Sequence, residues 1–419
     1  MGRSLLFMVH TPPLPAVTGS RLRSLALIRQ LAARGWDVSL FSLETGVPAQ
    51  QADLDELRTL CADVRFAHHG APKAVRMARM GVDLLRGRAF AHSMFRYPAA
   101  VREAHGWIAA GDFDVILAVG LYMLPYVPAR DRGRMLLDPQ NVETERVASM
   151  AAALWPRPRG VVARLQRRPV RRYEERAAAS AGSVLAVSDH DGAWFERCAP
   201  GRVSVVANGV DCAAIRPRDG DGRGGPVLFV GSMDYGPNVD GARVLLEDIA
   251  PRLSHPDVRI ALVGALPPAR LRAAAAAAPV AVEVTGRVAQ IAPWFDSSRL
   301  LAVPLRIGGG TRLKILEAMA HGLPVVTTSI GCAGLDVEHG RDVLIADDPA
   351  QFASWVDRLL ADDDLARDLA QRARQTVERS YDWRAIGAVL DHAVRDVLAR
   401  QRAPSSSADR SAPPIDAGR

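Results

Sequence analysis

The sequence predicts an α/β fold made of two domains of comparable size, each with a parallel sheet that helices cover on both faces. Short apolar runs of strand length alternate with helical patterns along the whole chain, which is typical of repeated βαβ units. One stretch, residues 216–226, is rich in Gly and Pro without periodicity, and the alternation restarts after it. With 419 residues the chain is long enough for two domains. A single large α/β domain with a long loop is the alternative.

The expected strands of the first half are residues 4–9, 37–42, 115–119, 135–137 and 183–187. Apolar residues at helical spacing over 22–34, stopped by Gly35, predict a helix between the first two strands. The expected strands of the second half are residues 227–230, 260–263, 280–284, 300–304 and 324–327. Most of these runs are apolar on both faces, as strands of buried parallel sheets are.

The domain organisation follows from these elements. We expect one domain at residues 1–215, a surface linker at 216–226, a second domain at 227–384 and a final helix over 385–400. Residues 401–419 are rich in Ser, Pro, Ala and Arg without a core-forming pattern, so we expect a disordered tail.

The formal net charge of +7 is carried almost entirely by arginine, since Lys73 and Lys314 are the two lysines of the chain. This balance fits an anionic lipid, a nucleic acid or a phosphorylated small molecule as partner. The four cysteines are far apart without metal-ligand spacing, so we expect them to be reduced and the protein to be cytoplasmic. The longest apolar stretches are shorter than the roughly 20 residues of a bilayer span. The N-terminal ten residues fit a buried strand better than a signal peptide.

A glycine-rich turn followed by a helix is the most informative feature of the chain. Gly308, Gly309 and Gly310 have no side chains, so a ligand can approach the backbone closely there. We expect a helix to begin near Thr311, as its N-cap, and to stop at Gly322. The free N–H groups and the positive dipole end of such a helix form an anion site.

Two cations and one acid lie in the first turns of this helix. Arg312 and Lys314 at a helix N-terminus are unfavourable for the helix itself, by up to about 1 kcal/mol. Charge-assisted hydrogen bonds to a phosphate contribute roughly 1.5–3 kcal/mol each, which reverses the balance. We therefore expect a multiply charged anion here, with Glu317 accepting hydrogen bonds from vicinal hydroxyls of a ribose. A glycine-rich connector with a solvated glutamate is the alternative.

Taken with blocks elsewhere in the chain, these residues resemble the family 4 glycosyltransferases. The resemblance runs from residue 4 to about residue 398. Its pieces are Pro12-Pro13 with Gly19 and Arg21, Asp138-Pro-Gln-Asn-Val-Glu143, Ser188, Asn208-Gly-Val-Asp211, Phe229-Val-Gly-Ser-Met-Asp-Tyr-Gly-Pro-Asn238 and the block from Gly308 to Val326. The resemblance implies the GT-B fold, in which two Rossmann-like domains face a central cleft.

The resemblance also implies a reaction. A hexosyl group would pass with retention from a nucleotide-diphospho-sugar, bound by the C-terminal domain, to a polysaccharide or lipid-linked glycan bound by the N-terminal domain. No metal and no cofactor would be needed, and the last helix would cross back to the N-terminal domain.

The same resemblance, with the residue arguments above, assigns roles. Arg312 and Lys314 would stabilise the leaving diphosphate, and Asp138 or Glu143 would orient the acceptor hydroxyl. A capping or surface acid is the alternative for the latter two. The residues expected to be catalytic are Arg312, Lys314 and Asp138. Those expected to bind the donor are Gly19, Gly231, Ser232, Gly308, Gly309, Gly310, Thr311, Arg312, Lys314 and Glu317. Those expected on the acceptor side are Arg21, Asn141 and Glu143.

The chain departs from the family pattern at three positions. Many members carry a Glu-x7-Glu pair that ends at the position of Glu317, and here its first position is Gly309. Many also carry Arg and Lys after the glycine of the first strand of the second domain, whereas Gly231 is followed by Ser, Met and Asp. We infer that the two cations of the later helix supply that charge. Gln140 stands where close relatives often have His.

Two other functions remain open at this point. A nucleotide-sugar epimerase on the same fold would need acid and base residues that the sequence does not identify. A non-catalytic sugar-nucleotide-binding scaffold is the other, because Gly309 replaces a carboxylate that normally faces the sugar.

A basic segment at residues 157–176 suggests a further partner. Prolines at 156, 158 and 169 are expected to interrupt any long helix, and apolar residues are interleaved with the charges. Such a segment fits an anionic membrane surface, with the protein peripheral on the inner face of the plasma membrane. A solvated connector is the alternative, and nucleic acid is not expected because no stacking aromatics accompany the charge. The arginines are Arg157, Arg159, Arg164, Arg167, Arg168, Arg171, Arg172 and Arg176.

Overall fold

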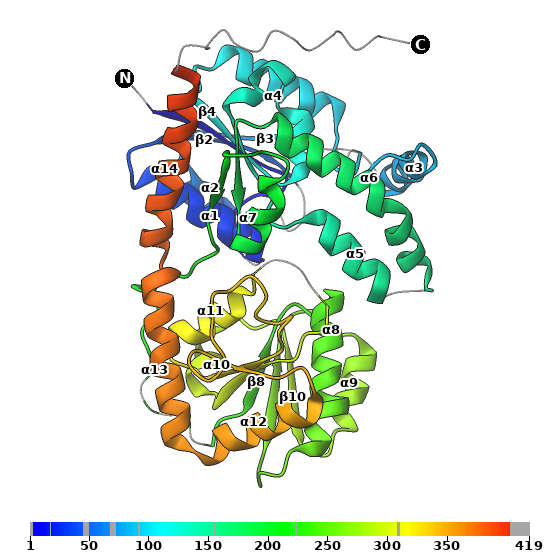
Figure 1. Ribbon diagram of the computed structural model, residues 1–419, viewed down its shortest axis with the longest axis vertical. Helices are drawn as coiled ribbons and strands as arrows, with labels where there is room; N and C mark the ends of the chain where they lie inside the picture. The colour runs from blue at the N-terminus through cyan, green and yellow to red at the C-terminus, as the bar shows by residue number, and fades with distance from the viewer. Residues whose placement is uncertain are drawn as a thin grey trace.

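The computed structural model of the chain contains two α/β domains stacked along its long axis (Figure 1). It describes residues 3–402 except 17, 45–49, 68–72, 91–92, 154–155, 219, 221, 223 and 308–310. Each domain has one parallel sheet between layers of helices. The predicted α/β class with two sheets is confirmed.

The sheet of the first domain has the strand order β3-β2-β1-β4-β5-β6-β7 over the described residues. Its strands are β1 (Ser4–Val9), β2 (Asp37–Leu43), β3 (Asp63–Ala67), β4 (Val115–Val119), β5 (Met135–Asp138), β6 (Ser183–Ala186) and β7 (Val203–Val205). Successive residues of β1 alternate between two cores, since Leu6 and Met8 face one and Leu5 and Phe7 face the other. All four are fully buried, as the apolar run predicts for a parallel sheet covered on both faces.

The helices of the first domain include those that cover these two faces. They are α1 (Gly19–Ala32), α2 (Gln51–Leu60), α3 (Lys73–Leu85), α4 (Pro98–Ala110), α5 (Glu143–Ala153), α6 (Pro158–Ser180) and α7 (Asp189–Glu196), with the 3-10 helices η2 (Leu121–Tyr126) and η3 (Ala129–Arg134). Helices α4, α6 and α7 contribute to the core around Leu6, and α1 and α2 contribute to the core around Leu5.

The second domain repeats this architecture, with the strand order β10-β9-β8-β11-β12-β13 over the part of the chain that the structure describes. Its strands are β8 (Val227–Val230), β9 (Arg259–Val263), β10 (Ala281–Gly286), β11 (Leu300–Val303), β12 (Val325–Thr327) and β13 (Leu344–Ile345). Its helices are α8 (Gly236–Arg243), the π-helix η4 (Val244–Ile249), the 3-10 helix η5 (Ala250–Arg252), α9 (Ala269–Ala276), α10 (Ala292–Ser297), α11 (Leu313–Ala320), α12 (Pro349–Ala361) and α13 (Asp363–Ser380).

The basic segment forms one helix, α6, which corrects the expectation that prolines would interrupt it. Pro158 occupies the first turn, where a missing N–H costs nothing. Pro169 lies inside the helix, where proline costs about 3 kcal/mol. A stripe of buried side chains at helical spacing, which includes Gln166, Val170 and Glu174, packs α6 onto the domain and offsets that cost.

The chain crosses between the domains twice, and the two crossings pair with each other. Val206 donates its N–H to the carbonyl of Ala186 in the first sheet, whereas Val210 packs in the core of the second domain. The N–H of Val210 donates to the Tyr381 carbonyl at 2.9 Å, and the N–H of Trp383 donates to the Val210 carbonyl at 3.1 Å. The first crossing therefore lies near residues 207–210, before the predicted linker at 216–226.

The described part of the predicted linker is fixed to the second domain. The N–H of Arg218 donates to the His321 carbonyl at 2.9 Å, and its guanidinium donates to the Gly322 carbonyl at 3.1 Å. This segment consequently belongs to the surface of the second domain, and the paired crossings are the place where a hinge can act.

Helix α14 (Trp383–Arg402) returns to the first domain, as predicted (Figure 1). Leu390, Val394 and Val397 are buried in the core that contains Leu5 of β1. Trp36 also donates its indole N–H to Asp391 Oδ1 at 2.7 Å. The predicted disordered tail lies outside the described residues from residue 403 on, and its first two residues belong to α14.

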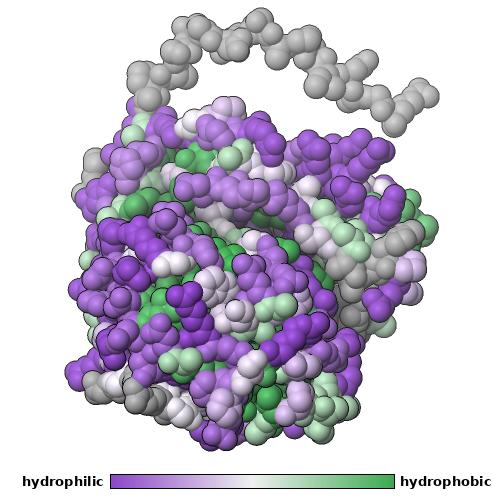
Figure 2. Space-filling view, turned by 60° about the horizontal axis from the view of Figure 1, so that its bottom comes forward, coloured by the Kyte–Doolittle hydropathy of each residue, from purple (hydrophilic) through white to green (hydrophobic). Residues whose placement is uncertain are grey.

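Hydrophilic side chains cover most of the face shown in Figure 2, with small apolar patches between them. Over the residues that the structure describes, none of the helices has a stretch long and apolar enough to cross a membrane.

Candidate functional site

Both parallel sheets have a switch point, at which the order of the strands along the sheet reverses. Strand β1 lies between β2 and β4, and β8 lies between β9 and β11. Ligands of open parallel sheets bind beyond the carboxyl ends of the strands at such a point. Loops beyond these ends meet across the two domains, because the Asn208 amide donates to the Thr311 hydroxyl and Gly19 lies against Leu313. The structure thus brings the predicted donor and acceptor sides together.

Helix α11 begins at Leu313 with Arg312 as its N-cap, which corrects the predicted N-cap at Thr311. The Thr311 hydroxyl accepts from Asn208 instead, and so it joins the two domains. The predicted stop at Gly322 is confirmed, since this residue has a φ of 69°. The expected donor-binding glycines 308, 309 and 310 lie outside the described residues.

Lys314 is held in a defined position on α11. Its Nζ donates to Asn238 Oδ1 at 2.9 Å and lies 4.8 Å from the centroid of the Phe229 ring. Burial, and then the positive charge of Arg312, lower the pKa of Lys314 to about 7, against the upward effect of Glu317. A phosphate beside this ammonium would favour its charged form and raise that pKa.

Glu317 lies one turn further along the same helix. Burial raises the pKa of its carboxyl to about 7, and the positive charge of Lys314 opposes this effect. Neighbouring groups whose pKa values are shifted toward each other, an acid upward and a base downward, are typical of functional sites.

Asn238 closes the turn after β8 and was not singled out as a site residue in the sequence. Its Nδ2 donates to the Ser232 carbonyl at 2.9 Å, while its Oδ1 accepts from Lys314. A Cβ at Gly231 would lie 2.6 Å from Asn238 Nδ2, so a larger residue would displace the amide. The Ser232 hydroxyl donates to Asp234 Oδ1 at 2.6 Å. The predicted donor residues Gly231 and Ser232 therefore belong to the turn that positions Lys314.

Asp138, which we expected to be catalytic, lies in a buried ion pair. Arg23 donates from Nε to Asp138 Oδ2 at 2.8 Å and from its terminal nitrogen to Oδ1 at 3.2 Å. Asp138 is fully buried, so its carboxylate has no exposed edge for an acceptor hydroxyl. Arg23 also donates to Asn208 Oδ1 at 3.1 Å. We therefore revise the expectation, because this geometry makes Asp138 a positioning residue for Arg23, Asn208 and Thr311.

The predicted residues Gly19 and Arg21 lie at the start of α1. Thr18 caps this helix by accepting from the Arg21 N–H at 3.4 Å. The Arg21 side chain is buried and donates to the Pro15 carbonyl at 3.1 Å, so it holds the loop before the helix. A Cβ at Gly19 would lie 3.3 Å from Leu313, which places the α1 N-terminus against the start of α11.

The predicted acceptor-side residues Asn141 and Glu143 lie between β5 and α5. Glu143 Oε2 accepts from Arg146 at 2.6 Å, and the Glu143 N–H donates to Glu174 Oε1 at 2.7 Å. Glu174 also accepts from Thr144 and so caps α5, and burial raises the pKa of Glu174 to about 7. Asn141 is half-buried. Glu143 is therefore paired with an arginine, and both residues are half-buried.

Two further residues at the carboxyl edge of the first sheet have properties typical of a site. The ring of His10, directly after β1, lies 5.0 Å from that of Phe95 and 5.1 Å from that of Tyr122. Burial lowers the pKa of His10 to about 4, so its imidazole is neutral at pH 7. Gln140 has a φ of 67°, a left-handed backbone conformation that is uncommon for residues with side chains. The position of His10 at the end of the first strand was the signal that sequence reasoning missed.

Among the described residues, no group of three or more His, Cys, Asp or Glu side chains is placed to hold a metal ion. The absence of an essential metal and of a cofactor stays a prediction.

Comparison with known proteins decides the family. Residues 17–214 match the model of "Glycosyltransferase Family 4", and residues 225–362 match "Glycosyl transferases group 1". The two matches together span both domains. The chain belongs to the family 4 glycosyltransferases.

Several curated proteins are similar to this glycosyltransferase in sequence. It is 29% identical over 308 residues to a phosphatidyl-myo-inositol mannosyltransferase of Mycolicibacterium smegmatis, across 70% of this chain and 74% of that protein. Matches to other relatives cover between 24% and 76% of their length.

Solved structures confirm the GT-B fold. Sucrose-phosphate synthase of Thermosynechococcus elongatus superimposes with a TM-score of 0.71 at 18% identity, over 95% of this chain and 100% of that one. Anabaena Alr3699/HepE, solved with UDP and glucose, gives a TM-score of 0.67 at 16% identity, over 94% of this chain and 100% of that one.

Proposed function

We propose that this glycosyltransferase transfers a hexosyl group, with retention, from a nucleotide-diphospho-sugar to a glycan or lipid-linked glycan acceptor. The observation that carries the proposal is the Lys314 ammonium. Asn238 and Phe229 hold it at the switch point of the second sheet, and Arg312 lies at the start of the same helix. The structural neighbour that contains UDP supports a nucleoside diphosphate as the donor group.

The residues of the site fit the departure of a diphosphate. As the bond between sugar and phosphate breaks, negative charge grows on the leaving diphosphate. Lys314 and Arg312 are already in place to stabilise that charge, which lowers the barrier more than the same charges in water would. Glu317 lies one helical turn from Lys314 and is proposed to accept hydrogen bonds from the ribose. No metal or cofactor takes part in this proposal.

The first domain is proposed to bind the acceptor. The carboxyl edge of its sheet carries the neutral imidazole of His10 after β1, and Gln140 and the half-buried Asn141 after β5. A relative whose name specifies a phosphatidyl-inositol acceptor supports a lipid-linked class.

A peripheral position on an anionic membrane is proposed from the surface of α3 and α6. Arginines of α6 are exposed next to exposed apolar side chains, among them Val162 and Leu165. Met77 and Leu85 of α3 are exposed as well. Binding to anionic vesicles at low salt that falls as salt rises supports the proposal, and no binding at low salt refutes it.

A calorimetric panel tests the donor site. UDP, GDP, ADP and dTDP, each beside its nucleoside, are titrated into the wild type, Lys314→Ala and Glu317→Ala. We expect one diphosphate to be preferred, and Lys314→Ala to weaken it by about ten- to a hundredfold, the loss of one charge-assisted hydrogen bond. The matching nucleoside should bind Lys314→Ala as it binds the wild type. An equal loss for both, or none, refutes the donor site.

Turnover separates the enzyme from its alternatives. Transfer of sugar to an added acceptor, with release of the nucleoside diphosphate, supports the glycosyltransferase reaction. Binding of donor without turnover on any acceptor supports a scaffold instead. The anomeric configuration of the product, read by NMR, decides whether transfer is retaining.

A further inference from the structure

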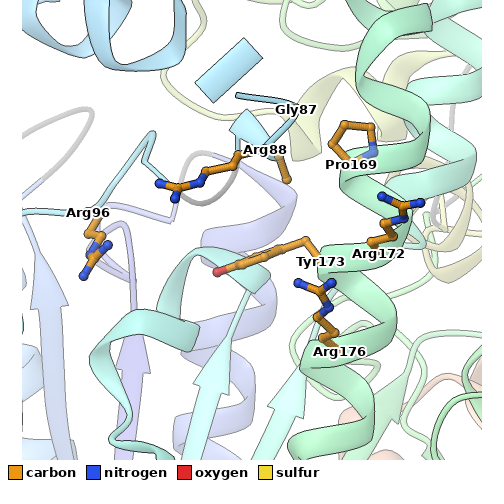
Figure 3. Close-up of a pocket in the computed structure, with 8 residues that line it drawn as sticks. Gly87, Arg88, Arg96, Pro169, Arg172, Tyr173 and Arg176 are labelled. Atoms are coloured by element: carbon orange, nitrogen blue, oxygen red, sulfur yellow. The ribbon is translucent and has the colours of Figure 1, made fainter. Parts of the chain in front are cut away.

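An arginine-lined cavity of about 450 Å³ lies in the first domain, outside the site described above (Figure 3). One wall is the segment that follows α3, and the other is the middle of α6. Figure 3 shows the side chain of Tyr173 extending between the two walls. The lining residues are Gly87, Arg88, Ala89, Arg96, Pro169, Arg172, Tyr173 and Arg176.

The described residues that line the cavity include four arginines and no acid. The guanidinium groups of Arg88, Arg172 and Arg176 make no ion pair with any described residue, although neighbouring Arg171 pairs with Glu175 at 2.7 Å. Like charges around one cavity repel each other, and a multivalent anion between them removes that repulsion. Guanidinium groups match phosphate oxygens in geometry as well as in charge.

The two walls are tied together before any ligand arrives. Buried Gln166 of α6 accepts from the Phe90 N–H at 2.8 Å and donates to the Arg88 carbonyl at 3.1 Å. These two hydrogen bonds fix the segment of Arg88 against the helix that carries Arg172 and Arg176. The arginines therefore surround a preformed space, which lowers the cost of binding.

The cavity adjoins the acceptor side of the site. The Tyr173 hydroxyl donates to the carbonyl of Leu121, the first residue of η2, which begins directly beyond β4. On the other wall, Arg96 follows Phe95, whose ring contacts those of His10 and Tyr122. An acceptor that extends from His10 past these aromatic rings would reach the arginines.

We propose that this cavity binds a phosphate or diphosphate ester carried by the acceptor. That the phosphate belongs to the acceptor rests on the proposed function, whereas binding of an anion in the cavity does not depend on the donor site. The phosphate is either that of a lipid headgroup or that of a soluble phosphorylated saccharide.

Pyrophosphate titrations test the cavity with the donor site blocked. Calorimetry is performed with a saturating amount of the preferred nucleoside diphosphate on the wild type, on Arg172→Gln/Arg176→Gln and on a control, Arg167→Gln/Arg168→Gln. The control removes the same charge from exposed positions of α6 outside the cavity. We expect the cavity variant to bind pyrophosphate at least about tenfold more weakly and the control to match the wild type. An equal loss in both variants, or no binding by the wild type, overturns the proposal.

Two further arms separate the possible failures and sources. Titrations of the preferred nucleoside diphosphate into the cavity variant should match those into the wild type. A wild type that binds none of the four diphosphates contradicts the donor site, while the pyrophosphate result, then obtained without a blocking nucleotide, still decides the cavity. Vesicles of phosphatidylcholine with phosphatidate then identify the source. Weaker vesicle binding by the cavity variant than by the control assigns the phosphate to a lipid, and equal binding assigns it to a soluble saccharide.

Discussion

Binding of a nucleoside diphosphate should draw a proton onto Lys314. In the free protein, burial and Arg312 lower the pKa of this ammonium to about 7. At pH 8 only about a tenth of the free protein then carries the proton, because the pH is one unit above the pKa. A phosphate beside Lys314 raises its pKa, so the complex is protonated. We therefore expect an uptake of about 0.9 proton per bound diphosphate at pH 8.

The choice of pH removes the contribution of the neighbouring acid. Glu317 has its pKa raised to about 7, so at pH 8 it is already mostly ionised in the free protein. Accepting hydrogen bonds from a ribose would keep it ionised, and its proton release on binding is therefore at most about 0.1. Above pH 8 the affinity should fall by up to about tenfold per pH unit, because more of the lysine must first be protonated.

Calorimetry in buffers with different ionisation enthalpies measures this uptake directly. Lys314→Arg is the matched control, since a guanidinium stays charged at pH 8 and binding should then take up almost no proton. Uptake that is the same in wild type and Lys314→Arg would refute the assignment of the proton to Lys314. No uptake in the wild type would show that the diphosphate does not lie beside this side chain.

Three further predictions concern stability. Asp138→Asn should lower the free energy of unfolding by about 3–5 kcal/mol, because it leaves Arg23 buried without a counter-charge. Chemical denaturation measures this loss, and Arg23→Met in the same chain should recover part of it. Unchanged stability with lost turnover would restore the catalytic role of Asp138. Because the pKa of Glu174 is raised, the folded wild type binds more protons than the unfolded chain between about pH 4.5 and 7, and its stability falls as pH rises through that range. Glu174→Gln should remove this contribution and so flatten the pH dependence of stability. Thermal unfolding across the same pH range measures the difference. Leu390→Ala should cost about 2–5 kcal/mol in the same denaturation assay, since the side chain is fully buried against the first domain, and a negligible loss would contradict the role of α14 in that core.

The central strands could be predicted from the sequence because their residues are apolar whichever face they occupy. Strands β1, β4 and β8 span the expected residues. The strands that sequence reasoning missed are the edge strands β3, β7 and β13. The first four residues of β3 alternate between exposed and half-buried, and β7 and β13 have three and two residues, so none contains an apolar run of recognisable length.

The donor side was predictable where the chemistry is local. Gly231 permits the close turn after β8, to which Ser232 also belongs, and the spacing of α11 places the Lys314 ammonium against that turn. Its partner Asn238 is 76 residues away in the sequence, and the partner of Asp138 is 115 residues away. No local pattern in the sequence reveals such pairs. Asp138 was therefore interpreted as an available acid at a strand end, whereas in the structure its carboxylate is paired with Arg23.

The position of that ion pair explains how the site is held between two domains. Asp138 fixes Arg23, Arg23 fixes Asn208, and Asn208 donates to Thr311, which directly precedes the N-cap of α11. The same segment continues into Val210, which pairs with the returning chain before α14. Closure of the domains cannot move the start of α11 relative to the first domain without altering this chain of hydrogen bonds. The buried pair is therefore well placed to influence how far the two switch points approach.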